Sequence, residues 1–182
     1  MSELCVNIIE GKTPDKSVES YWNSNDVMWF TTPDFPDNTI NIEKSNQFVS
    51  KNAILDNKVK IIPINSVLLS CTATLGRTGV TRVELTTNQQ IKALITNEKV
   101  TPEYLSYYFK FSNFDMSNLT NNSGVKHINL SILKNIQIPV PPLAEQEKIV
   151  AQVSEMEAKI AELESLMAQA SNQKKAILHK YL

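Results

Sequence analysis

The last forty residues of the chain carry its clearest hydrophobic pattern. Apolar positions recur there in alternating steps of four and three residues, a repeat of about 3.5 that is typical of a helix lying along another helix. The positions are Ile149, Val153, Met156, Ile160, Leu163, Met167 and Ala170. They predict a C-terminal helix over residues 143–182, with this stripe as a dimerisation surface.

The predicted helix is long and uninterrupted. Pro141 and Pro142 favour an extended approach followed by a helix start, and no proline or glycine occurs between Leu143 and Leu182. At the usual rise per residue this helix would extend roughly 55 Å. An amphipathic helix usually packs on its own domain, but this one is longer than a domain of about 140 residues is wide. The length therefore favours a partner helix, in the same or another chain.

The first 142 residues alternate short β-branched runs with turn-forming clusters, which predicts one β-rich globular domain. The strands are expected at 27–31, 59–64, 66–70, 79–83 and 91–95, with one or two more in 127–130 and 136–138. Thr101 and Pro102 predict the start of a helix that runs to Lys110, and the polar residues 113–124 predict an exposed loop. The predicted fold class is α+β: a mixed, β-rich domain over 1–142, followed by a long coiled-coil helix over 143–182.

Composition limits both the size and the partners of this fold. With 182 residues, of which 42% are hydrophobic, the chain can bury one core plus an appendage. Its net charge is -1, so any nucleic-acid surface has to come from local clustering of cations. The two cysteines lack disulfide or metal spacing, and the N-terminus lacks a signal-peptide pattern. We therefore expect a cytoplasmic protein.

No catalytic constellation stands out. The four glycines form neither a dinucleotide fingerprint nor a phosphate-binding loop, and His127 and His179 are too isolated to suggest a metal pair. Gly76-Arg77-Thr78-Gly79 matches the GxxG loop of KH domains, but we interpret it as a hairpin turn because the flanking helices of that module are missing. We expect a protein that is not an enzyme and that uses no cofactor and no metal.

Four segments, in the right order, resemble the specificity subunit of type I restriction-modification systems. They are Gly11–Asp34 (with Gly11–Pro14, Tyr21-Trp22 and Val27–Asp34), Ser66–Gly76, Thr87–Leu94 and Ile138–Gln146. Cys71 departs from the family pattern, in which an arginine or serine is commoner. Members of the family carry two target recognition domains and two spacer helices, whereas this sequence holds one of each. The chain therefore resembles half of such a subunit.

The resemblance implies a function in DNA recognition without catalysis. In this family a target recognition domain recognises one half of a split DNA target, and the spacer helices separate two such domains. The spacer also docks methyltransferase subunits and, through them, a motor-nuclease restriction subunit. The resemblance implies that this chain pairs with itself as a homodimer, recognises an inverted repeat in double-stranded DNA and directs a DNA methyltransferase subunit. The near-neutral charge leaves an alternative open, a coiled-coil interaction adaptor that does not bind DNA.

Polar side chains on loops are the candidates for DNA contact, because they can donate to or accept from base edges and phosphates. The candidates are Lys12, Thr13, Thr31, Thr32, Arg77, Thr78, Asn121, Asn122, Ser123, Lys126 and His127. For each of them the alternative is a solvated loop residue or a turn former.

Overall fold

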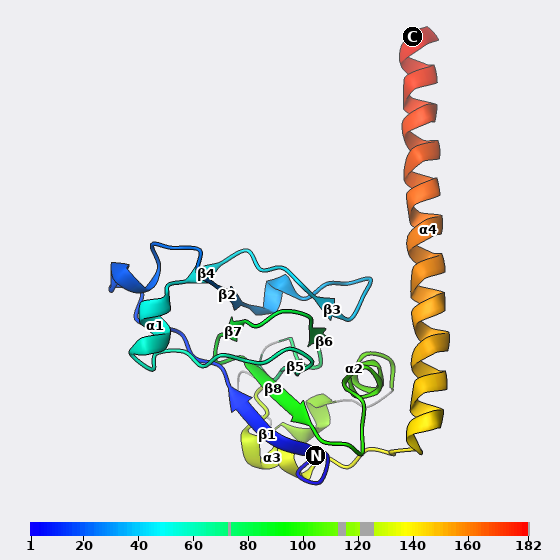
Figure 1. The fold of residues 1–182 in the computed structure, drawn as a ribbon. Coiled ribbons are helices and arrows are strands. Elements are labelled where there is room, and N and C mark those ends of the chain that lie inside the picture. The colour runs from blue at the N-terminus through cyan, green and yellow to red at the C-terminus, as the bar shows by residue number, and fades with distance from the viewer. Residues whose placement is uncertain (73, 113–115, 121–125, 182) are drawn as a thin grey trace.

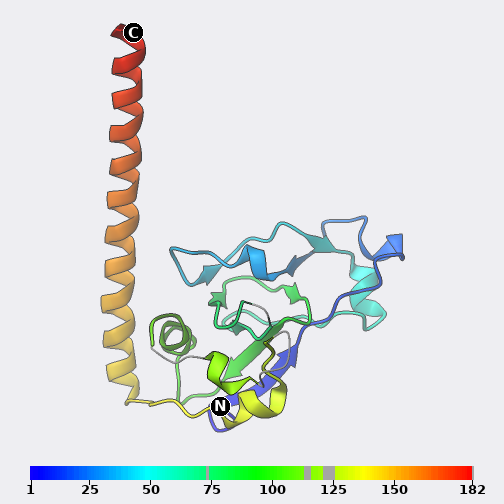
Figure 2. The same ribbon diagram turned by 180° about the vertical axis from the view of Figure 1, so that it is seen from behind.

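A computed structural model describes residues 1–72, 74–112, 116–120 and 126–181 of the chain. It consists of a globular part and one long helix, α4 (Leu143–Tyr181), whose first part runs alongside the globular part and whose C-terminal part extends beyond it (Figures 1 and 2). Both views place α2 (Pro102–Phe111) between α4 and the sheet. None of the described helices is long and apolar enough to cross a membrane.

A five-stranded sheet forms the centre of the globular part. Its strand order is β1 (Cys5–Glu10), β8 (Ile91–Thr96), β5 (Val67–Ser70), β6 (Thr78–Thr81) and β3 (Asn41–Ile42). Neighbouring strands are antiparallel except β3 and β6, which are parallel. Every residue of β5 is buried, which is typical of a strand covered on both faces.

A smaller sheet lies over one face of the first. It contains β4 (Phe48–Val49), β2 (Val27–Phe30) and β7 (Thr86–Thr87), with β2 antiparallel to β4 and parallel to β7. The remaining elements are α1 (Lys51–Leu55), α3 (Leu130–Asn135) and the 3-10 turns η1 (Glu19–Tyr21), η2 (Thr32–Asp34) and η3 (Met116–Leu119).

Alternating residues of the central strands fill two separate cores. Val67 and Leu69 of β5 pack on the side of α2 and α3, together with Leu105 and Leu133. Leu68 points to the opposite face and packs beneath the smaller sheet. Because strand side chains alternate between faces, one short strand serves both cores. A third cluster joins η1, β2 and α1 at the edge of the smaller sheet.

The α+β class and the long C-terminal helix are confirmed. Strands lie within or across four of the expected ranges, 27–31, 66–70, 79–83 and 91–95. The helix at Pro102 is also confirmed, and its cap is Thr101, whose Oγ1 accepts a hydrogen bond from the Tyr104 backbone nitrogen at 3.2 Å.

Three expected strands were wrong. Residues 59–64 contribute only an isolated bridge between Ile62 and Leu85, and residues 136–138 form no strand. Residues 127–130 provide one bridge and then the start of α3, because the Asn129 side chain caps that helix by accepting from the Ile132 backbone nitrogen at 2.9 Å. Much of the expected loop 113–124 lies outside the described residues, and Met116–Leu119 form η3.

Candidate nucleic-acid interface

One end of the five-stranded sheet collects the loops that carry the candidate side chains. Strand β1 ends at Glu10 opposite Lys92, and Ser70 at the end of β5 lies opposite Ile91 at the start of β8. Leu69 lies opposite Thr78 at the start of β6. The loops that leave β1 and β5, and those that enter β8 and β6, therefore lie at the same end, which we call the sheet end.

Lys12 and Thr13 lie at the β1 side of the sheet end, and both are exposed. The Thr13 hydroxyl donates to the Gln89 side-chain oxygen. Together with Lys58 these residues line an open cavity of about 560 Å³. A side chain on Gly11 would overlap with the carbonyl oxygen of Asn88, so a glycine is required where these loops cross.

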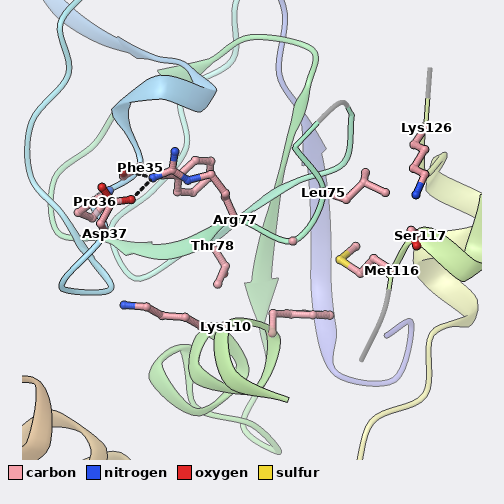
Figure 3. Close-up of a pocket in the computed structure, with 12 residues that line it drawn as sticks. Phe35, Pro36, Asp37, Leu75, Arg77, Thr78, Lys110, Met116, Ser117 and Lys126 are labelled. Carbon is pink, nitrogen blue, oxygen red and sulfur yellow. Dashed lines mark hydrogen bonds and ion pairs between the residues drawn. The ribbon is translucent and has the colours of Figure 1, made fainter. Parts of the chain in front are cut away.

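Arg77 lies at the β6 side of the sheet end, in a second cavity of about 520 Å³ (Figure 3). Its Nη2 donates to the Phe35 carbonyl oxygen at 2.7 Å and to Asp37 Oδ1 at 2.6 Å. Lys110 and Lys126 line the same cavity, and Figure 3 shows Lys126 on the side away from Asp37. Three cations from distant parts of the sequence therefore surround one hollow.

Lys126 and His127 are exposed, and contacts of His127 and Ile128 with the loop after β5 hold this segment at the sheet end. His127 Nδ1 and Thr72 Oγ1 are 2.8 Å apart, and the Ile128 backbone nitrogen donates to the Cys71 carbonyl oxygen at 2.8 Å. Cys71 itself is buried, and burial raises the pKa of its thiol to about 12, so the thiol stays protonated.

Three of the candidate threonines are interior residues. Thr31 is buried, and its hydroxyl and backbone nitrogen both donate to Asp34 Oδ2 at 2.7 Å. Thr32 is buried beside Gln90, and the buried Thr78 hydroxyl lies 3.2 Å from that of Ser106. Their expected exposure is therefore wrong, because their polar groups are bonded within the domain, and their contact with DNA stays a prediction. Asn121, Asn122 and Ser123 lie outside the described residues.

The sheet end also holds an ion pair that the sequence did not suggest. Lys92 is buried, and its Nζ contacts Oε1 of the half-exposed Glu10. The hydrogen bond and charge of Lys92 lower the pKa of Glu10, with smaller contributions from His127 and Lys60. The available signal was a lysine inside the apolar run of β8. Among the described residues no cluster of His, Cys, Asp and Glu could hold a metal ion.

The apolar stripe of α4 divides into two parts. Ile149 and Val153 are partly buried against the globular core, in the part of the helix that also carries the buried Gln146. The rest of the stripe is exposed: Met156 (65%), Ile160 (52%), Leu163 (52%), Met167 (73%) and Ala170. Leu166, which the 3.5-residue pattern does not include, is exposed by 52%.

The exposed part of the stripe does not point in the same direction as the side of α4 that carries Gln146, Val153 and Glu157. Ile149 points in nearly the same direction as the exposed part, and it is partly buried because it lies near the base of the helix. With about 100° of rotation per residue, the mean direction of Met156, Ile160, Leu163 and Met167 lies roughly 70° around the helix axis from that of Gln146, Val153 and Glu157. The helix can therefore contact its own domain with one side and leave an apolar flank open. We call Met156, Ile160, Leu163 and Met167 the exposed seam.

Known proteins resemble this chain over about four-fifths of its length. It is 29% identical over 147 residues to the MjaIX type I restriction enzyme specificity subunit of Methanocaldococcus jannaschii, covering 79% of this chain and 34% of that protein. It is 30% identical over 155 residues to the EcoprrI specificity subunit of Escherichia coli, covering 82% of this chain and 38% of that protein. The chain thus spans between about a third and two-fifths of the length of these relatives.

A solved structure shares the fold. It is a chain from a structural study of the complex assembly and conformational transition of the type I R-M system. The two chains superpose with a TM-score of 0.72 at 24% identity, and the match covers 96% of this chain and 41% of that one. Residues 2–170 match the family described as the type I restriction modification DNA specificity domain. Because that match includes both the globular part and most of α4, the chain belongs to this family.

Proposed function

We propose that this chain is a non-catalytic DNA-recognition subunit that pairs with a second copy of itself and directs a DNA methyltransferase subunit. In this proposal the sheet end recognises one half of a bipartite target, and α4 joins the two copies. A restriction subunit would join through the methyltransferase. The observation that carries the proposal is the family match over residues 2–170, because it includes both the proposed DNA-binding part and the proposed joining part.

The distribution of polar groups supports DNA contact at the sheet end. Lys12, Lys58 and Lys126 supply cations there that can contact phosphates, and Gln89 and His127 supply groups that can donate to or accept from base edges. Arg77 is partly neutralised by Asp37, so it contributes less net charge. The interface is therefore a local cluster on a domain whose overall charge is close to balanced.

The exposed seam supports pairing through α4. Four large apolar side chains lie in one row on a helix that extends beyond its own domain. Isolated helices in water are marginal without tertiary contacts, and burial of a Leu, Ile or Met side chain contributes about 1.5–3 kcal/mol. A second copy offers the same row, so a two-fold interface would cover both rows at once.

Binding of the purified chain to a random pool of duplex DNA, at low and raised salt, tests this function. The proposal predicts a dimer by light scattering and DNA affinity that falls steeply with salt, because phosphate contacts release counterions. A dimer with no DNA binding, even with the methyltransferase subunit present, would instead support the interaction adaptor.

A further inference from the structure

The long helix is joined to the globular part by polar contacts at two levels, around one fully buried and one partly buried side chain. Further along the helix, an exposed hydrogen bond runs from Asn38 Nδ2 to Glu164 Oε2 at 2.9 Å. At the first level, Gln146 is fully buried, with 0% of its surface exposed. Its Nε2 donates to the carbonyl oxygens of Lys99 at 2.9 Å and Pro141 at 2.8 Å. Its Oε1 accepts from the Thr101 backbone nitrogen at 2.9 Å. One side chain thus connects the first turn of α4 to the segment before α2.

The second level lies about three helical turns further along α4. The Tyr107 hydroxyl of α2 is 3.0 Å from Ser154 Oγ and donates to Glu157 Oε2 at 2.9 Å. Lys110 Nζ contacts the other oxygen of the same carboxylate, Glu157 Oε1, at 2.9 Å. The side chains of Lys110 and Glu157 are only 20% and 15% exposed, so water screens this pair less than a surface pair.

Apolar contact fills the space between these two levels. Ile149, Val150 and Val153 pack against the core that contains α2 and α3. Apolar contact is not directional, so by itself it would let α4 rotate or tilt on the domain. Hydrogen bonds are directional, and two sets of them at separate points along one helix define both its rotation and its tilt.

We propose that Gln146 and Glu157 are positioning residues that fix the direction of α4 relative to the sheet end. In the paired assembly, this direction would set the separation and rotational phase of the two DNA-binding surfaces. The proposal thus has two steps. The first, that these residues fix the direction of α4, concerns the single chain. The second, that this direction sets the spacing of the DNA-binding surfaces, rests on the proposed function. Half-site spacing would thus depend on the joint formed by Gln146, Ser154 and Glu157 as well as on the length of α4.

The size of the effect follows from the length of the helix. A tilt of roughly 10° at the joint moves a point about 25 residues further along the helix by roughly 6 Å. One base-pair step is about 3.4 Å, so a small tilt corresponds to nearly two base pairs. Loss of the joint should therefore widen the accepted range of half-site spacings without changing the sequence recognised in each half.

Distance measurements within one chain test the first step without any DNA. Spin labels would be placed at exposed positions on α1 and on α4 beyond the joint, in a background with Cys5 and Cys71 replaced by alanine. Labelled chains would be diluted in excess unlabelled chain, so that only distances within one chain are recorded. The parent should give one narrow distance distribution. Gln146→Ala and Glu157→Ala should each broaden this distribution. The control is Glu162→Ala, which replaces an exposed glutamate on the same helix and should leave the distribution narrow.

Binding to DNA pools in which the half-site spacing varies tests the second step. The parent and Glu162→Ala should select one spacing, whereas Gln146→Ala and Glu157→Ala should accept several with the same half-site sequence. Unchanged distance distributions in both joint variants would overturn the proposal. Broadened distances with unchanged spacing selection would overturn its DNA part. If the parent chain binds no DNA, the proposed function is contradicted. The distance measurements would still decide whether Gln146 and Glu157 fix the direction of α4.

Discussion

The Thr101 backbone nitrogen donates a hydrogen bond to Gln146 Oε1 at 2.9 Å, although the two residues are 45 positions apart. Thr101 also caps α2 through its hydroxyl, which accepts from the Tyr104 backbone nitrogen. One residue therefore fixes the start of α2 and the start of α4 together. This contact fixes the base of the long helix to the domain, although the C-terminal part of the helix extends beyond it.

Gln146→Ala should lower the free energy of unfolding by about 2–4 kcal/mol, because the fully buried Gln146 side chain bonds three backbone groups that would lose their partner. Urea denaturation measures this difference. Gln152→Ala is the matched control, since Gln152 is exposed on the same helix and should change stability by less than about 0.5 kcal/mol. Equal effects of the two substitutions would show that burial of Gln146 does not stabilise the junction.

If the proposed dimer forms through the exposed seam, Leu163→Asp should give a monomer, because the new carboxylate would have to be buried in the seam without a partner. Light scattering over a range of protein concentrations measures the mass directly. Ala158→Asp places the same charge on the opposite side of α4 and should leave the dimer intact. A Leu163→Asp chain that remains dimeric would exclude the exposed seam as the interface.

Lys12→Ala combined with Lys126→Ala should weaken DNA binding and reduce its salt dependence. Each lost phosphate contact lowers the slope of log affinity against log salt by ~0.9 on duplex DNA. The matched double variant is Lys99→Ala with Lys134→Ala, two exposed lysines beyond the other end of the sheet. If both double variants reduce the slope equally, the sheet end is not the DNA-binding surface.

Glu10 should contribute stability that depends on pH. Its pKa in the folded chain is lowered from 4.5 by the ion pair with Lys92, so the contribution is present above the unfolded-state pKa and is lost as the pH falls through the lower folded value. Urea unfolding of wild type and Glu10→Gln across this acidic range measures it. The variant should be less stable near neutral pH, and the difference should shrink in acid. A difference that stays constant with pH would contradict this role.

Elements with strong local signals were predictable from the sequence. The seam repeat and the proline pair predicted α4, and Thr101 with Pro102 predicted α2, because these signals act within a few residues. Strand β1 was missed because it forms by pairing with β8, more than 80 residues later in the chain. The apolar run 59–64 resembles a strand, but it makes only one bridge. Whether β1 and residues 59–64 form strands therefore depends on pairing with segments far away in the sequence, which local patterns do not show.

The site was predictable only in part, because exposure depends on packing. Thr31 was expected on the surface, yet Thr31 and Asp34 form a reciprocal capping box, and the spacing of Thr31-Thr32-Pro33-Asp34 was the available signal for it. The stripe on α4 was read as one continuous surface. Its first two members, Ile149 and Val153, pack against the domain instead, because they lie in the part of the helix where Gln146 and Glu157 also contact the domain.

Selection of a random duplex DNA pool by the purified full-length chain tests the central claim most directly. The account predicts enrichment of two identical half-sites in inverted orientation, separated by one fixed spacing, since two copies related by two-fold symmetry would bind them. Absence of any enriched sequence, with the methyltransferase subunit either present or absent, would contradict it.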